Sequence, residues 1–176
     1  MAPADLIELL TADHHRVTNL LADGAPARQL VRELEAHLVA EAQVLYPALR
    51  RHLPQAGTAV DGLVDTDHRI EEALADLDHD GGGPEHVGQL AEVTRLFAHH
   101  VREQERLFAE LRPAAGEDEL TRLAEVLGPV LMEAPTHPHP HLPREGRLEA
   151  IADSLASTVD HLRDALRREK REGGEG

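Results

Sequence analysis

The sequence contains no cysteine and no tryptophan, and its aromatic side chains are limited to one tyrosine and two phenylalanines. Without cysteine, the 176-residue chain cannot form disulfides, thiolate zinc sites or cysteine-ligated iron–sulfur clusters. So few aromatic rings leave no stacking platform for bases, and a formal net charge of −15 repels nucleic-acid phosphates. We therefore expect no nucleic-acid partner.

Long apolar runs are also missing. No stretch approaches the roughly 18 apolar residues that a membrane span needs, and the amino-terminal segment MAPADLIELL lacks the basic and apolar regions of a signal peptide. These observations predict a cytoplasmic protein with no membrane partner. Lys170 is the single lysine, and no glycine-rich phosphate loop occurs, which argues against lysine-based catalysis and phosphate-loop nucleotide binding.

Alanine and leucine dominate the apolar residues, which favours helices over strands. Apolar residues recur at helical spacing in four segments, 4–22, 27–52, 58–79 and 85–112. Short loops between successive helices make neighbours antiparallel. The sequence therefore predicts an all-α, up-down-up-down four-helix bundle over residues 1–113, with Pro47 bending or breaking the last turns of the second helix.

Residues 114–176 predict a C-terminal helical extension. It comprises a shorter helix at 117–133, a His/Pro-rich linker at 134–145 and an amphipathic helix at 146–169. We expect that last helix to pack on the bundle or in a dimer, so the protein is predicted to be a monomer or a homodimer.

Two motifs occur once in each half of the predicted bundle. The pair Asp13-His14 of the first helix recurs as Asp67-His68 in the third. The second motif is a histidine followed by a glutamate four residues later and an aromatic residue nine residues later. It comprises His37, Glu41 and Tyr46 in the second helix, and His99, Glu103 and Phe108 in the fourth.

The spacing of His37 and Glu41 places both on one face of a helix, and leucines share that face. Burying such groups without partners costs several kcal/mol per charge, and a bundle core avoids the cost by binding metal. Imidazole and carboxylate ligands suit iron. The pattern predicts a dinuclear centre in the core, with six candidate ligands: His14, His37, Glu41, His68, His99 and Glu103.

Three further residues are alternatives or additions to that set. His14 continues the apolar stripe of its helix and His15 does not, so His14 is favoured. His99 matches the second helix, but His100 is the other candidate at that place. Glu72 lies four residues after His68 and is either an added ligand or a solvated side chain. Tyr46, half a turn away from His37, is expected to serve packing.

These motifs resemble those of hemerythrin-like proteins with an HHE cation-binding domain. The matching pieces are LLTADHHRV, HLVAEAQVLYPAL, DTDHRIEEAL and HHVREQERLF, and the resemblance covers residues 4–112. It implies a four-helix bundle with an oxo-bridged pair of non-haem irons (Fe–O–Fe). The histidines 14, 37, 68 and 99 would be terminal ligands, with Glu41 and Glu103 as bridging carboxylates.

The chain also departs from that family. The branch that carries O2 has a histidine where this chain has Glu72, and the Glu-Glu pairs frequent in the family are Glu41-Ala42 and Glu103-Gln104 here. The resemblance implies a protein that binds or reacts with O2, peroxide or nitric oxide. Catalase-like turnover is one form of that function, and an iron- or O2-sensing or storage module without turnover is the alternative. Zinc or manganese in place of iron and a metal-free structural bundle remain open.

Overall fold

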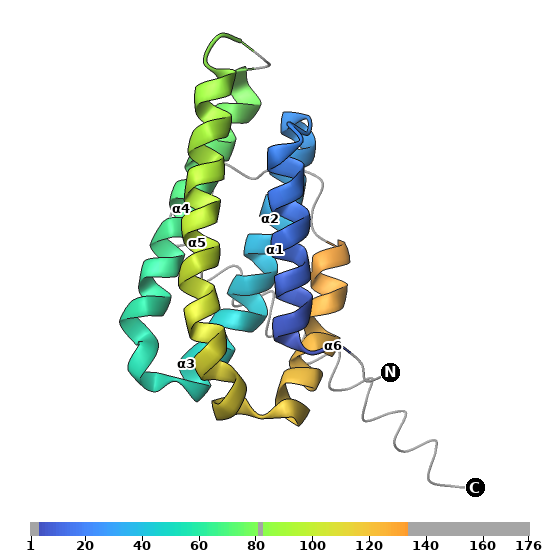
Figure 1. The fold of residues 1–176 in the computed structure, drawn as a ribbon, viewed down its shortest axis with the longest axis vertical. Helices are drawn as coiled ribbons and strands as arrows, with labels where there is room; N and C mark the ends of the chain where they lie inside the picture. Colours follow the sequence, from blue (N-terminus) through green and yellow to red (C-terminus); the bar gives the residue numbers. More distant parts are fainter. Residues whose placement is uncertain (1–3, 81–82, 134–176) are drawn as a thin grey trace, which may run out of the picture. The chain divides into compact units, whose positions relative to one another are not determined.

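The computed structural model describes residues 4–80 and 83–133, and these residues form helices and no strand. The elements are α1 (Leu6–Ala22), α2 (Ala27–Ala40), the π-helical turn η1 (Glu41–Leu45), α3 (Tyr46–His52), the 3₁₀ turn η2 (Pro54–Ala56), α4 (Gly57–Asp80), α5 (His86–Ala115) and α6 (Glu117–Glu133). The elements α2, η1 and α3 follow one another as one continuous helix. Together with α1, α4 and α5 it forms the predicted four-helix bundle (Figure 1). The predicted linker at 134–145 and helix at 146–169 lie outside the described residues.

The start of α1 is fixed by a capping box. The backbone N–H of Glu8 donates to Oδ1 of Asp5 at 2.9 Å, and the backbone N–H of Asp5 donates to Oε2 of Glu8 at 3.1 Å. The capped helix buries Leu10, His14 and Val17 on one face. The capping box thus sets where α1 begins, and the apolar stripe sets which of its residues face the core.

The second helix of the bundle continues past Pro47 to His52 through a π-helical turn, so of the two outcomes expected at this proline the structure excludes the break. Proline has no N–H, and in a regular α-helix its ring clashes with the carbonyl of residue i−4. The chain accommodates Pro47 by widening the preceding turn, in which the N–H of Tyr46 donates to the carbonyl of Glu41, five residues earlier. This π turn inserts one residue into the helical register, so the side chains that follow it are rotated relative to an uninterrupted α-helix.

The helix α6 packs beside α1 and α2 (Figure 1). Leu120 and Leu127 are fully buried and belong to the same apolar cluster as Leu6 and Leu49. The described part of the predicted extension is therefore packed on the bundle. The helix α5 also runs to Ala115, three residues past the end predicted for it.

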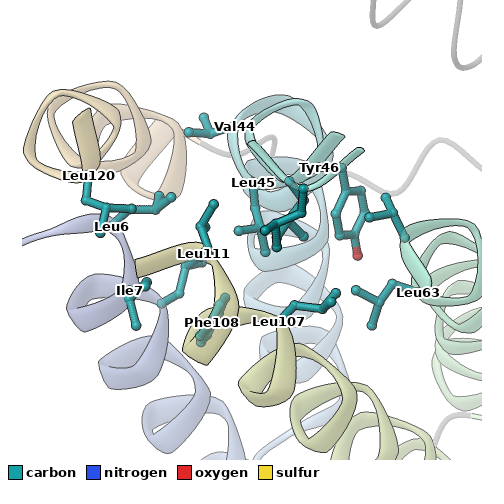
Figure 2. Close-up of a cluster of buried hydrophobic side chains, with 14 of the residues drawn as sticks. Leu6, Ile7, Val44, Leu45, Tyr46, Leu63, Leu107, Phe108, Leu111 and Leu120 are labelled. Carbon is teal, nitrogen blue, oxygen red and sulfur yellow. The ribbon is translucent and has the colours of Figure 1, made fainter. Parts of the chain in front are cut away.

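Two apolar clusters fill the core. The first apolar cluster gathers side chains from α1, η1, α3, α4, α5 and α6, among them Leu6, Leu45, Leu63, Leu111 and Leu120 (Figure 2). The second apolar cluster lies further along the helices and includes Val17, Leu34, Ile70, Leu74 and Leu96. On α1, α2, α4 and α5, buried polar residues occur between the positions that contribute to these clusters, so the bundle contains a polar layer enclosed at both ends.

Candidate metal centre

Four side chains of the buried polar layer converge on one place in the core. His14 of α1 is 2% exposed, and His37 of α2, Glu41 of η1 and His100 of α5 are fully buried. One donor atom from each of the four side chains lies within 4.8 Å of the others. Three imidazoles and one carboxylate therefore converge on a single point in the core.

Glu41 is at the middle of this cluster. Its Oε1 lies 2.9 Å from Nε2 of His37 and 3.5 Å from Nε2 of His14, and its Oε2 lies 2.9 Å from Nε2 of His100. Each histidine thus turns its Nε2 toward the carboxylate. This is the arrangement in which imidazoles and a carboxylate share a cation.

Two aspartates lie behind the histidines. Oδ2 of Asp13 accepts a hydrogen bond from Nδ1 of His37 at 2.7 Å, and Oδ1 of Asp67 lies 2.9 Å from Nδ1 of His100. A carboxylate on one ring nitrogen fixes the tautomer and directs the other nitrogen to a metal. The repeated Asp-His motif therefore has a structural meaning: the aspartate of one helix orients the histidine of the next.

All of the protein's phenylalanine and tyrosine residues lie at this centre. Phe108 stacks on the ring of His14 with centroids 6.0 Å apart, and Phe97 stacks on His100 at 5.9 Å. The hydroxyl of Tyr46 donates to Oδ2 of Asp67 at 2.5 Å and lies 3.4 Å from Oε2 of Glu41. The rings thus enclose the imidazoles and help to exclude water from them.

The mutual electrostatics of the cluster are strong. Burial alone would lower the pKa of His37, but the negative charge of Glu41 and the hydrogen bond to Asp13 outweigh it and raise that pKa to about 9. The same balance, with Glu41 and Asp67, raises the pKa of His100 to about 10. Burial opposes ionisation of Glu41, yet the two imidazolium charges hold its pKa well below the ordinary value. For His14, burial dominates and lowers the pKa.

The donor set fits a metal ion. Both ring nitrogens of His14, Nε2 of His37 and of His100, and Oε1 of Glu41 are buried without a hydrogen-bond partner among the described residues. Bonds from a metal to such nitrogen and oxygen atoms are about 2.1 Å long, so donors on opposite sides of one ion are about 4.2 Å apart. Only a small contraction of the cluster is needed, and ligation would satisfy the unpaired atoms.

The structure brings together three of the six favoured candidates, His14, His37 and Glu41. The adjacent alternative His15 is exposed. On α5 the expected face is off by one residue: His100 and Gln104 are fully buried, and His99 and Glu103 are only half-buried. His99 and Glu103 instead line a groove of about 460 Å³ between α4 and α5, next to Gly62, Thr66 and Arg106.

The π turn explains this one-residue difference. In sequence, His37 and Tyr46 have the same separation as His99 and Phe108. The helix α5 has no π turn, so the inserted residue of η1 has no counterpart there. After the π turn, Tyr46 of one motif corresponds to Phe108 of the other. Before it, the correspondence is shifted by one residue, and His100 is therefore the structural counterpart of His37. The signal in the sequence is Pro47, because a proline within a helix can shift the register of the residues around it.

The same turn brings Tyr46 to the centre. An uninterrupted α-helix would place it half a turn from His37, where packing was its expected role. One inserted residue rotates it back toward the cluster, as its contacts with Glu41 and Asp67 show. Sequence reasoning also assigned no role to the buried residues Asp67 and Gln104.

The remaining candidates lie on α4. His68 is 33% exposed, with Nδ1 3.5 Å from Oε2 of Glu71, and Glu72 is exposed. Neither is in the cluster of four. The helix α4 thus contributes Asp67 where the sequence analysis placed His68.

A helical bundle with a buried layer of histidine and carboxylate defines a class of cation-binding domains. The hemerythrin HHE cation-binding domain matches residues 5–111, and the chain belongs to that family. The chain is similar to an uncharacterised hemerythrin-like protein of Schizosaccharomyces pombe, with 26% identity over 141 residues, covering 78% of this chain and 70% of the relative. No solved structure gives a significant match.

In residues 4–80 and 83–133, no helix combines the length and the apolar character that crossing a bilayer would require.

Proposed function

We propose that this protein binds non-haem iron at the centre formed by His14, His37, Glu41 and His100, and that the bound iron binds or reacts with O2, peroxide or nitric oxide. The observation that carries the proposal is the convergence of four buried side chains whose metal-binding atoms have no other hydrogen-bond partner in the described part of the chain. Membership of a cation-binding family supports it.

The donor chemistry supports iron and a small ligand. Neutral imidazole and carboxylate are ligands that non-haem iron accepts, and an octahedral ion has six positions. Three imidazoles and one carboxylate leave at least one of these positions open. The apolar clusters on both sides and the rings of Phe97 and Phe108 leave little space, which favours small molecules such as O2, peroxide or nitric oxide.

Metal analysis tests the proposal. The purified protein is stripped of metal, loaded with Fe(II) without oxygen and assayed for bound iron. We expect His37→Ala and Glu41→Ala to lose the bound iron, since each removes a converging donor. His15→Ala, which changes the exposed neighbour of His14, is the matched control and should retain it. A wild-type protein that binds no iron, or donor variants that keep all of it, would refute the proposal.

Turnover separates the two forms of this function. In a redox enzyme of the catalase type, the iron-loaded protein destroys many equivalents of peroxide. In a sensing or storage module, it reacts with about one equivalent and then stops. Visible absorption under O2 or nitric oxide, recorded on the same samples, detects a bound ligand in either case.

A further inference from the structure

We infer that the centre holds one metal ion, where the sequence predicted two, and that Gln104 sets this number. The inference rests on the proposed iron site and concerns its stoichiometry. Glu41 supplies a carboxylate in the first half of the bundle. Its structural counterpart in the second half is Gln104, which has an amide instead.

The correspondence between Glu41 and Gln104 follows from the helices. Glu41 lies four residues after His37, and Gln104 lies four residues after His100, the residue that occupies the matching place on α5. Both Glu41 and Gln104 are fully buried. A carboxylate can bridge two cations and offset their charge, whereas a neutral amide offsets none.

The side chain of Gln104 is fully buried, and the polar group that acts on it is the hydroxyl of Tyr46. Within the residues that the structure describes, neither Oε1 nor Nε2 of Gln104 forms a hydrogen bond of normal geometry. An unpaired buried amide is costly, so the position calls for a polar neighbour. A water or small ligand on the single ion would provide one.

The residues expected to hold a second ion are outside the cluster. His68 is one-third exposed, and His99 and Glu103 line the groove between α4 and α5. Two octahedral ions would need about twelve coordination positions. The four converging side chains fill most of the positions of one ion and cannot supply a second.

The nearby aspartates are already engaged. Oδ1 of Asp13 accepts from Arg16 at 2.7 Å, and its Oδ2 accepts from His37. For Asp67, Oδ2 accepts from Tyr46 and Oδ1 faces His100. Each of these four oxygens lies within 3 Å of a side-chain donor, so a second ion would have to compete with those contacts. Glu41 is the one carboxylate within the cluster of four.

The closing experiment counts ions. The metal-free full-length protein is titrated with Fe(II) alone in the absence of oxygen, and bound iron per chain is determined by elemental analysis. We expect a stoichiometry of one. After oxidation, an isolated ferric ion gives an EPR signal, whereas an oxo-bridged ferric pair is silent because its spins are coupled. Two ions per chain with a silent spectrum would overturn the inference and leave the iron-binding proposal standing, whereas no bound iron would overturn the proposal itself.

Variants test the role of Gln104 directly. Gln104→Glu places a carboxylate at the position that corresponds to Glu41, and we expect its stoichiometry to rise above one toward two. Gln89→Glu makes the same change far from the centre on α5 and should stay at one. Equal stoichiometry in both variants would overturn the role assigned to Gln104. His99→Ala and Glu103→Ala should leave the stoichiometry at one, and a loss in either would show that they bind iron.

Discussion

Asp13 holds His37 in place by a hydrogen bond of 2.7 Å between Oδ2 and Nδ1, and this bond joins α1 to α2. Arg16 contacts the other oxygen of Asp13, so the carboxylate is fixed on both sides. The imidazole is thereby left with Nε2 pointing toward Glu41. The aspartate thus directs Nε2 of His37 toward the candidate site without belonging to the cluster of four.

We predict that Asp13→Asn weakens iron binding without unfolding the bundle. An amide cannot hold the imidazole as a carboxylate does, and loss of such partners typically costs about 10- to 100-fold in metal affinity. Competition titration with a chelator measures the change. Asp65→Asn on the exposed face of α4 is the matched control and should have wild-type affinity. Wild-type affinity in Asp13→Asn would contradict the positioning role.

Two neighbouring histidines on α5 should differ sharply. We predict that His100→Ala loses iron and that His99→Ala keeps it, because His100 is fully buried beside Glu41 while His99 lines the outer groove. Iron content and the visible spectrum of the loaded proteins provide the measurement. The reverse result would contradict this assignment and favour His99, the residue that the sequence motif indicates.

The metal-free protein should lose stability as pH rises. The pKa of His37 is raised from an ordinary 6.5 to about 9, and that of His100 to about 10. A raised pKa contributes stability that is fully present below about 6.5 and is lost as pH increases through the folded-state value. We therefore expect the free energy of unfolding, measured with urea, to fall by a few kcal/mol between about pH 6.5 and about pH 10.

The variant Glu41→Gln is the control for this pH effect. The carboxylate of Glu41 is the main group that raises both histidine pKa values, so its removal should flatten the dependence over that window. On the acid side the sign is opposite. Because the pKa of Glu41 is held below its ordinary 4.5, its contribution is present above that value and disappears as pH falls further. An unchanged alkaline slope in Glu41→Gln would contradict the assigned cause.

Removal of the Tyr46 hydroxyl should lower the stability of the metal-free protein. The variant should still bind iron. Tyr46→Phe leaves Oδ2 of Asp67 buried without its partner, and such a loss costs about 1–3 kcal/mol. Urea unfolding of the metal-free protein measures the cost. Thr66→Val, which removes a hydroxyl bonded to the carbonyl of Gly62 within α4, should have a smaller effect. A neutral Tyr46→Phe would show that the contact with Asp67 contributes nothing.

The bundle could be predicted from the sequence because its information is local. Apolar residues at helical spacing, the Asp5–Glu8 capping box and the glycines between segments specify helices and their ends one segment at a time. His37 and Glu41 could be paired for the same reason, since four residues of one helix decide which side chains share a face. The stripe of α1 alone favours His14 over His15, and in the structure His14 is buried and His15 is exposed.

Only the tertiary structure shows which histidine of α5 lies beside His37 and Glu41. Comparison of the two halves by sequence offset assumed equal helical register, and the π turn at Glu41–Leu45 breaks that equality. On α5 the offsets pointed to His99 and Glu103, whereas the structure buries His100 and Gln104. The assumption of equal register also hid Tyr46, which the turn rotates toward Asp67.

The sequence by itself determined a helical bundle with His14, His37 and Glu41 on its inner faces, because burial pattern and helical period follow from neighbouring residues. Only the tertiary structure decided which of these side chains converge, because convergence depends on the rotation of each helix about its axis. One residue of register rotates a side chain by about 100°. That rotation is enough to move a histidine from the buried cluster to an outer groove.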